Sequence, residues 1–362
     1  MPDQKSPYLK EFHAHSVWGK YEFHVEFKDG VNFISGLNGS NKSTLLYLIY
    51  SSLNSAQPLP FLDFFASKST FSDGNMSWMS YFSNLDKSQQ VRFAEAVKLQ
   101  TSAGNNEVDY DIPPFSKKFF RDVEQTLSAV NAYTVYGSGE ETNAVRLKAP
   151  AIKEGSNNQP FAQLIATSLM PFDLLDDNAN QQEPADKNQS LVLCLTNMDI
   201  HLNKVVSDFL KYEYGLFEQV IDNNLTDKET IFAKRNQLED IINSFFLETG
   251  KQLIRNNDKA IAFKYIDSDV QMNVASLSHG EKSLLHLLLT VFLEQHTNRI
   301  FLLDEPETAL HLSWQKRLAS TLTQLAPDCQ FILTTHSPGI VSGNWLPRLN
   351  DMSKIRTSME DV

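Results

Sequence analysis

The sequence predicts an α/β fold built on a parallel sheet, with an N-terminal antiparallel β subdomain and a helical insertion. Three observations support this fold class. The strand-like run Val31–Ser35 leads through a Gly-rich loop into an apolar helix pattern. Two further short apolar runs, Ile300–Leu303 and Phe331–Thr335, lie near the C-terminus. Continuous apolar runs of this length are typical of parallel strands that are buried on both faces.

The Gly-rich loop has the strand–loop–helix context that a phosphate-binding loop requires. Backbone N–H groups and the positive end of the helix dipole would face the phosphates. Lys42 is expected to offer the phosphates a point charge, and the Ser43 hydroxyl is expected to reach Mg²⁺. The predicted nucleotide-binding residues are Gly36, Asn38, Gly39, Ser40, Asn41, Lys42, Ser43 and Thr44.

Asn41 stands where the phosphate-binding pattern has glycine. Asn is the least costly non-Gly residue at a positive φ, so we expect a loop of the same shape. Its side chain would still crowd the phosphates. We therefore expect nucleotide binding to survive and hydrolysis to be slow.

Two carboxylates, Asp304 and Glu305, end the run Ile300–Leu303. In open α/β sheets, ligands bind at the carboxyl ends of the strands. Asp304 is expected to hold Mg²⁺ and Glu305 to orient the attacking water, because phosphoryl transfer depends on positioning and charge stabilisation. The alternative is that the two acids only cap the next helix.

Ser278 and Glu281 form an S-x-x-E capping box at the start of a strongly apolar helix. The capping box does not explain Gly280, because glycine costs about 1 kcal/mol in a helix unless the backbone must approach something closely. A phosphate at a helix N-terminus is such a partner.

His336 follows the strand pattern Phe331–Thr335. A histidine at the end of a strand can contact a γ-phosphate and report its presence. The alternative is a purely structural histidine. Its position in Thr334-Thr335-His336-Ser337 after the acidic pair favours the catalytic interpretation.

Together these motifs resemble the heads of ABC/SMC-class ATPases, and most closely the stand-alone ATPases of the OLD (overcoming lysogenization defect) type. The resemblance covers roughly residues 8–55 and 260–345. It implies a P-loop NTPase fold of the ABC-ATPase type that hydrolyses ATP to ADP and phosphate, with ATP and Mg²⁺ as cofactors. It also implies that Ser278, Gly280 and Glu281 act in trans, which requires a homodimer or a higher even-numbered oligomer.

The same resemblance implies a separate effector, a nuclease or toxin of an anti-phage defence system, which the ATPase controls as a switch subunit. Members with a fused Toprim nuclease carry it after the His motif, and the roughly 25 residues after His336 leave no room for one. Two alternatives stay open. One is a DNA-repair or DNA-maintenance SMC/RecF-like ATPase, and the other is a barely hydrolysing, nucleotide-gated scaffold suggested by Asn41.

We expect three regions: residues 1–60 and 261–362 as the two halves of the head, and 61–260 as an insertion. The insertion is expected to contain a polar loop over Tyr136–Gln159 and a short helical hairpin over about 197–253, which projects from the head. The second helix of this hairpin is expected to span Asp227–Leu253.

Composition limits the partners. A net charge of −12 argues against a broad nucleic-acid surface, although direct nucleic-acid binding stays open. Cys194 and Cys329 have no metal or disulfide spacing, which favours a reducing, cytoplasmic location. No apolar stretch approaches the length of a membrane span, so we expect no membrane partner.

Weaker candidates lie near the N-terminus. His13 and His15 place two imidazoles on one strand face, but no third metal ligand is apparent. Aromatic residues of the opening hairpin, such as Tyr21 and Phe23, are expected either to stack on adenine or to pack as a half-buried strand. Gln57 is a further candidate for the Mg²⁺-linked glutamine of ABC ATPases.

Overall fold

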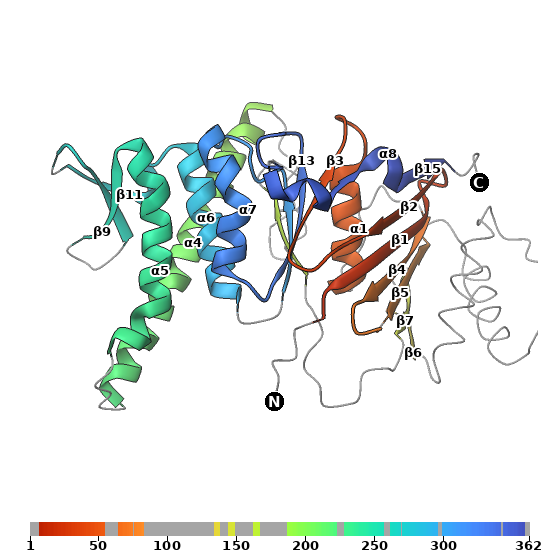
Figure 1. The fold of residues 1–362 in the computed structure, drawn as a ribbon, viewed down its shortest axis with the longest axis horizontal. Helices are drawn as coiled ribbons and strands as arrows, with labels where there is room; N and C mark the ends of the chain where they lie inside the picture. Colours follow the sequence, from red (N-terminus) through yellow and green to blue (C-terminus); the bar gives the residue numbers. More distant parts are fainter. Residues whose placement is uncertain are drawn as a thin grey trace, which may run out of the picture.

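A computed structural model gives the fold of the chain (Figure 1). It describes residues 7–54, 64–74, 76–82, 134–137, 144–148, 162–166, 187–222, 228–256, 261–268, 270–295, 299–341 and 343–358. The described elements form layers in which a parallel sheet and an antiparallel sheet enclose one helix, and further helices cover the other face of the parallel sheet.

The central sheet is parallel, as the apolar runs predict. Its strand order is β14-β3-β13-β12-β8, with every described pair parallel. β12 and β13 are buried along their whole length, which explains why their sequences show no polar alternation. The strands are β3 (Val31–Ser35), β8 (Ala162–Ala166), β12 (Ile300–Asp304), β13 (Gln330–Thr335) and β14 (Leu349–Asp351).

The predicted opening hairpin belongs to a second, antiparallel sheet of order β15-β2-β1-β4-β5-β7-β6. β1 pairs with β2 across the turn 18–20. The strands are β1 (Leu9–Val17), β2 (Tyr21–Glu26), β4 (Phe64–Phe71), β5 (Met76–Phe82), β6 (Thr134–Gly137), β7 (Ala144–Lys148) and β15 (Arg356–Ser358).

Helix α1 (Lys42–Asn54) lies between the two sheets (Figure 1). It follows β3 directly, so its N-terminus meets the carboxyl edge of the parallel sheet. Its apolar residues share a buried cluster with Phe12 and Phe23 of the antiparallel sheet and with Ile332 of β13. The position of this helix end is therefore fixed by packing on both sides.

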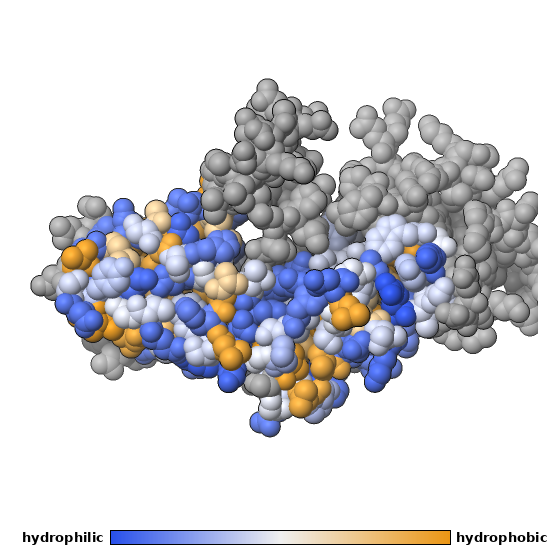
Figure 2. All heavy atoms as spheres, turned by 90° about the horizontal axis from the view of Figure 1, so that it is seen from above, coloured by the Kyte–Doolittle hydropathy of each residue, from blue (hydrophilic) through white to orange (hydrophobic). Residues whose placement is uncertain are grey.

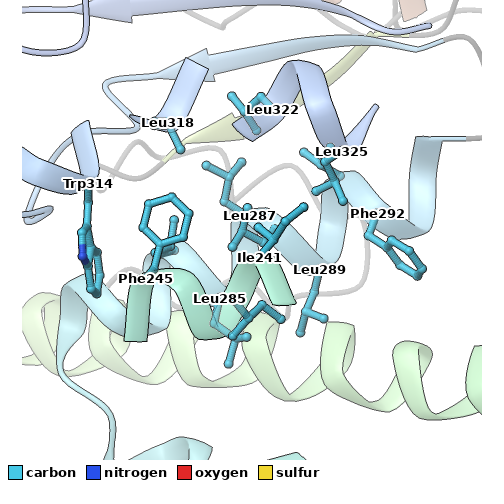
Figure 3. Packing of buried hydrophobic residues seen from close by; sticks show 14 of the residues in the cluster. Ile241, Phe245, Leu285, Leu287, Leu289, Phe292, Trp314, Leu318, Leu322 and Leu325 are labelled. Atoms are coloured by element: carbon cyan, nitrogen blue, oxygen red, sulfur yellow. The ribbon is translucent and has the colours of Figure 1, made fainter. Parts of the chain in front are cut away.

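Helices α6 (His279–Glu294) and α7 (Leu312–Leu325) cover the opposite face of the parallel sheet, and α4 (Lys187–Asp222) and α5 (Lys228–Phe246) pack on them. Figure 3 shows the core that these helices share. Phe245 meets Trp314 edge to face with ring centroids 5.7 Å apart. Such aromatic pairs add about 0.5–1.5 kcal/mol beyond their buried area.

The helical hairpin exists, but three expectations about it are wrong. Its first helix begins at Lys187 rather than near residue 197. Its second helix ends at Phe246 rather than Leu253, because Gly250 takes a left-handed φ of 72° and the chain continues as a strand. The hairpin also packs along α6, through Phe209 and Tyr212 against Phe292, and only its far end extends beyond the other helices in Figure 1.

A small antiparallel sheet follows the hairpin. Its order is β11-β10-β9. The strands are β9 (Lys251–Arg255), β10 (Ile261–Tyr265) and β11 (Gln271–Asn273). The short helical turns are η2 (Leu247–Thr249), η3 (Val274–Ser276), η5 (Gly343–Arg348) and α8 (Met352–Ile355).

The region expected as an insertion also contributes to both large sheets. The expected loop Tyr136–Gln159 contains the end of β6 and all of β7, so that expectation is wrong there. β8 joins the parallel sheet beside β12. Sheet pairing with strands far away in sequence stabilises these short segments, and no local pattern reports such pairing.

The surface in Figure 2 shows hydrophobic residues in separate patches among hydrophilic ones. In the part of the chain that the structure describes, no helix combines the length and apolar character needed to cross a bilayer.

Candidate functional site

The Gly-rich loop forms the turn between β3 and α1, as predicted. Gly39 and Asn41 have φ values of 76° and 75°, so Asn41 adopts the left-handed backbone that the loop requires. Gly36 has no room for a side chain, because a Cβ there would lie 2.5 Å from Ser40 Oγ and 2.9 Å from Met352 Cβ. The loop therefore wraps the N-terminus of α1, where backbone N–H groups attract anions.

Arg356 supports Asn41 from the other end of the chain. Its Nη1 donates a hydrogen bond to Asn41 Oδ1 at 2.7 Å, and its guanidinium lies over the ring of Tyr21 at 4.7 Å. Tyr21 and Phe23 were adenine-stacking candidates. Phe23 is buried in the core, which corresponds to the packing alternative, and Tyr21 is covered by Arg356.

Lys42 is 5% exposed and points back into the loop. Its Nζ donates to the carbonyl oxygens of Gly36 at 3.3 Å and Leu37 at 3.4 Å and also contacts His336 Nε2. Burial lowers the pKa of Lys42, and the nearby carboxylates, first Glu305, oppose this shift. A buried ammonium group that hydrogen-bonds to backbone carbonyl oxygens is well placed to bind phosphate oxygens instead.

Asp304 and Glu305 lie at the carboxyl end of β12, as predicted. Thr334 of the neighbouring strand positions both residues: its Oγ1 donates to Asp304 Oδ1 at 2.5 Å and accepts from the Glu305 N–H at 3.0 Å. Glu305 has a positive φ of 48°, a conformation that costs about 1–3 kcal/mol in a non-Gly residue. Such strain persists where the surrounding structure fixes the position of a side chain.

His336 lies between the loop and the acidic pair. Its Nε2 is 3.2 Å from Glu305 Oε1 and also contacts Lys42. The structure thus brings together Lys42, Glu305 and His336, which come from three separate segments. This is the constellation that the sequence motifs predict around a γ-phosphate.

Glu307 was not among the predicted site residues, but it supports His336. Its Oε1 accepts hydrogen bonds from Thr335 Oγ1 at 2.5 Å, from the His336 N–H at 3.1 Å and from the Ser337 N–H at 3.4 Å. Burial raises the pKa of Glu307, and these hydrogen bonds act in the opposite direction. A second acid two residues after Glu305 was the only sequence signal for this role.

The donor set at this edge fits Mg²⁺. Ser43 lies in the first turn of α1 and Asp304 at the end of β12, so a hydroxyl and a carboxylate both come from the carboxyl edge of the parallel sheet. Hard oxygen ligands of this kind, completed by water and phosphate, are what Mg²⁺ prefers. Gln57 lies outside the described residues.

Ser278 caps α6 through the predicted capping box. The Ser278 N–H donates to Glu281 Oε2 at 2.9 Å, and the Glu281 N–H donates to Ser278 Oγ at 3.4 Å. Glu281 also accepts from Lys251 Nζ at 2.6 Å and Thr249 Oγ1 at 2.8 Å. Its carboxylate is thus engaged within the chain, and Ser278 and the helix N-terminus are the groups that can meet a phosphate.

A packing contact within the chain requires a glycine at position 280, and the sequence pattern does not show this contact. A Cβ at this position would lie 2.3 Å from the carbonyl oxygen of Ala309, which itself has a positive φ of 66°. This contact within the chain explains a glycine at position 280 without a phosphate, and the role of Gly280 in trans stays a prediction. The close packing of α6 on the segment after β12 requires this glycine.

Ser278, Gly280 and Glu281 (the signature residues) line a pocket of about 240 Å³. The described residues around it are Thr249, Lys251, Ser278, Gly280, Glu281, Ala309, His311 and Trp314. No residue of the Gly-rich loop is among them. This pocket is therefore lined by the signature residues and not by the phosphate-binding loop.

Comparison with known proteins identifies the family. Residues 31–342 match the family described as "AAA domain, putative AbiEii toxin, Type IV TA system". The chain belongs to this AAA-domain family. The predicted α/β fold class is confirmed, and the order of the motifs agrees with membership of this family.

Curated relatives of this AAA-domain chain include two retron proteins. "Retron Vc95 probable ATPase" of Vibrio cholerae serotype O1 biovar El Tor is 28% identical over 131 residues, which cover 33% of this chain and 25% of that protein. "Retron Ec83 probable ATPase" of Escherichia coli is 36% identical over 84 residues, or 20% of this chain and 16% of that protein. The chain therefore spans a quarter or less of the length of these relatives.

Similarity also extends to SMC proteins. Structural maintenance of chromosomes protein 3 of Caenorhabditis elegans is 23% identical over 196 residues, which cover 52% of this chain and 15% of that protein. Among solved structures, the SMC head domain from Thermotoga maritima aligns with 95% of this chain and 94% of its own at 15% identity and a TM-score of 0.40.

Proposed function

We propose that the chain is an ATP-hydrolysing switch subunit that works as a nucleotide-sandwiched dimer. The observation that carries this proposal is that Ser278 and Gly280 line a pocket to which the loop around Lys42 contributes no residue. In a two-fold dimer, the Ser278 end of one copy would meet the phosphate held by Lys42 of the other, and the reverse.

Exposed apolar side chains at both elements support this association. Leu37 of the Gly-rich loop is 84% exposed, and Leu312, next to the signature-pocket residue His311, is 57% exposed. Each would lose contact with water if the two elements met across a dimer. A two-fold arrangement of two copies brings one Leu37 and one Leu312 to each of two equivalent sites.

In the proposed reaction, Lys42 and the loop N–H groups hold the β- and γ-phosphates of ATP. Ser43 and Asp304 would hold Mg²⁺, which neutralises phosphate charge when bound. Glu305 would orient the attacking water, and His336 would contact the γ-phosphate. Ser278 of the second copy would complete the charge stabilisation, so that hydrolysis depends on dimerisation.

We further propose that the dimer controls a separate effector, a nuclease or toxin, in an anti-phage defence system of the OLD-like kind. Two relatives are named as retron ATPases, and the family description refers to a toxin of a type IV TA system. The exchange between an ATP-bound dimer and free subunits would provide the two states that a switch requires.

The first experiment compares Ser278→Arg with Ser320→Arg. Both are made in the Glu305→Gln background, which is expected to hold ATP without turnover. Ser320 is exposed on α7, away from the signature pocket, and is the matched control. With ATP, the control should sediment as a dimer and Ser278→Arg as a monomer with unchanged ATP affinity. Unchanged dimerisation of Ser278→Arg would contradict the shared site.

The similarity to an SMC protein supports a second candidate function, that of a DNA-maintenance ATPase. It predicts that DNA stimulates turnover with a steep dependence on salt, because phosphate contacts release counterions. The net charge of −12 counts against it. Turnover that DNA does not change at low salt would remove this candidate.

Asn41 is the reason to retain a third candidate, a nucleotide-gated scaffold that binds ATP and hardly hydrolyses it. Such a protein would act by ligand-stabilised assembly alone. If Asn41→Gly turns over ATP at the same rate as the wild type, Asn41 gives no reason to prefer a scaffold.

A further inference from the structure

A cluster of metal-ligand side chains lies on the antiparallel sheet, apart from the nucleotide site. It consists of Glu11 and His13 on β1 and His24 on β2. His13 and His24 face each other directly in the β1–β2 register, and Glu11 is two residues before His13, on the same strand face. One ligand atom from each of the three residues lies within 4.8 Å of the other two.

The three side chains already converge on one point. His13 Nε2 is 2.8 Å and His24 Nε2 is 2.9 Å from the same carboxylate oxygen, Glu11 Oε1. The imidazole centroids are 3.9 Å apart. Since both histidines direct the same nitrogen toward the same carboxylate, a small shift of Glu11 would let an ion take the place between them.

The cluster is buried on one side and exposed to solvent on the other. The His13 side chain is 9% exposed, whereas those of Glu11 and His24 are 31% and 39% exposed. Two hydrogen-bonded strands hold the ligands, which limits the entropy lost when they bind an ion. The exposed side leaves space for water or an exogenous ligand.

His15 is not part of this cluster, although the sequence pairs it with His13. Its Nδ1 contacts Glu22 Oε2 at 2.6 Å, and both side chains are buried. The third ligand that sequence reasoning lacked is therefore supplied by His24 from the next strand, together with Glu11.

We propose that Glu11, His13 and His24 bind a divalent transition-metal ion, for which Zn²⁺ fits best, with an open coordination position on the exposed side. Two imidazoles and one carboxylate are a Zn²⁺ ligand set, and a site with three protein ligands keeps a position for water. Imidazole nitrogens also favour Zn²⁺ over Mg²⁺ and Ca²⁺, which take oxygen ligands.

The ion would clip β1 to β2. β2 pairs with β15, which carries Arg356, so the clip stabilises the sheet that supports the Gly-rich loop. Lys68 lies opposite His13 on β4, and its charge weakens the binding of a cation. We therefore expect moderate rather than very tight affinity. The metal site does not depend on the proposed ATPase function.

The test is a Zn²⁺ titration of the full, chelator-treated chain without nucleotide, in competition with a chromophoric chelator. The wild type should bind one ion at this site, and the melting temperature should rise with free Zn²⁺ because the ion binds the folded state. Glu11→Gln and His24→Asn should each weaken binding roughly tenfold or more.

Two control variants show whether Zn²⁺ binds at other histidines of the chain. His15→Asn changes a neighbouring histidine outside the cluster, and His336→Ala removes the imidazole at the nucleotide site, where an ion could bind Glu305 and His336. Both should retain the Zn²⁺ affinity of the wild type. Binding unchanged in Glu11→Gln and His24→Asn, or lost in either control, would overturn the site.

Co²⁺ gives a second readout that needs no folded Glu11 variant. Wild-type protein with Co²⁺ should show visible ligand-field absorption from nitrogen and oxygen ligands, which Zn²⁺ displaces. This band should be absent from His24→Asn and present in His15→Asn. A wild-type spectrum identical to that of aqueous Co²⁺ would also overturn the proposal.

Discussion

Arg356 donates a hydrogen bond to the amide oxygen of Asn41 at 2.7 Å, across 315 residues of sequence. Asn41 occupies the left-handed conformation in a loop position where the common pattern has glycine. The hydrogen bond directs the Asn41 side chain toward β15. Arg356 is thus a specific hydrogen-bond partner for the residue that replaces glycine in this loop.

A double-mutant cycle tests this pair. Arg356→Ala should raise KM for ATP severalfold, because hydrogen bonds to a charged donor contribute about 1.5–3 kcal/mol, and less where the donor is partly exposed, as Arg356 is. In the Asn41→Gly background the same substitution should change little. Arg356→Lys is the matched control, which keeps the charge but not the planar fork. Additive effects in the cycle would show that the two residues act independently.

Glu307 is expected to act as a positioning residue for His336. Glu307→Ala removes the acceptor shared by Thr335, His336 and Ser337. We expect kcat to fall roughly tenfold or more while the Kd for ATP stays close to that of the wild type, since losing a buried partner costs about 1–3 kcal/mol. Glu307→Gln, which keeps an acceptor oxygen, should recover part of the rate. A change in Kd alone would contradict this role.

Gly280→Ala and Gly215→Ala form a matched pair that should change the free energy of unfolding in opposite directions. At Gly280 the new Cβ would meet the Ala309 carbonyl oxygen, so we expect a loss of about 1–3 kcal/mol in unfolding free energy. At Gly215 in α4, no heavy atom lies within 4 Å of the new Cβ, and alanine favours the helix by up to about 1 kcal/mol. Urea denaturation measures both. Equal effects would show that the Ala309 contact does not require glycine.

The pKa of Glu281 predicts how the stability of the fold depends on pH. Burial alone would raise its pKa, but the hydrogen bonds from Lys251, Ser278 and Thr249 outweigh it, and the pKa lies below the ordinary value of 4.5. Because the folded pKa is lower than the unfolded one, the stabilisation is present above pH 4.5 and is lost as pH falls through the folded pKa.

Unfolding free energy should therefore fall in this acidic window in the wild type and fall less steeply in Glu281→Gln. Urea titrations between about pH 7 and pH 3 measure the slope. Glu218→Gln, on the exposed face of α4, is the control and should keep the slope of the wild type. An unchanged slope in Glu281→Gln would contradict the assignment.

The sequence predicts well those features that local pattern determines. The continuous apolar runs place β12 and β13 in a buried parallel sheet, and the S-x-x-E pattern places the start of α6 at Ser278. The contact of Lys42 with His336 could be inferred because both follow strands of one sheet, and parallel strands bring their carboxyl ends to one edge.

Other features depend on partners that are distant in sequence. No pattern around Arg356 indicates that β15 pairs with β2 and reaches Asn41. Likewise, His24 becomes a neighbour of His13 only through the register of the hairpin. The packing contact of Gly280 is hidden in the same way, because its neighbour Ala309 lies in another segment.

The most direct test of the shared site is complementation between two inactive variants. Lys42→Ala keeps an intact signature element, and Ser278→Arg keeps an intact phosphate-binding loop. If each site is shared, mixed dimers contain one intact site, and an equal mixture should regain up to about a quarter of the wild-type ATP turnover. A mixture that stays as inactive as its two components, although mixed dimers form, would contradict the nucleotide-sandwiched dimer.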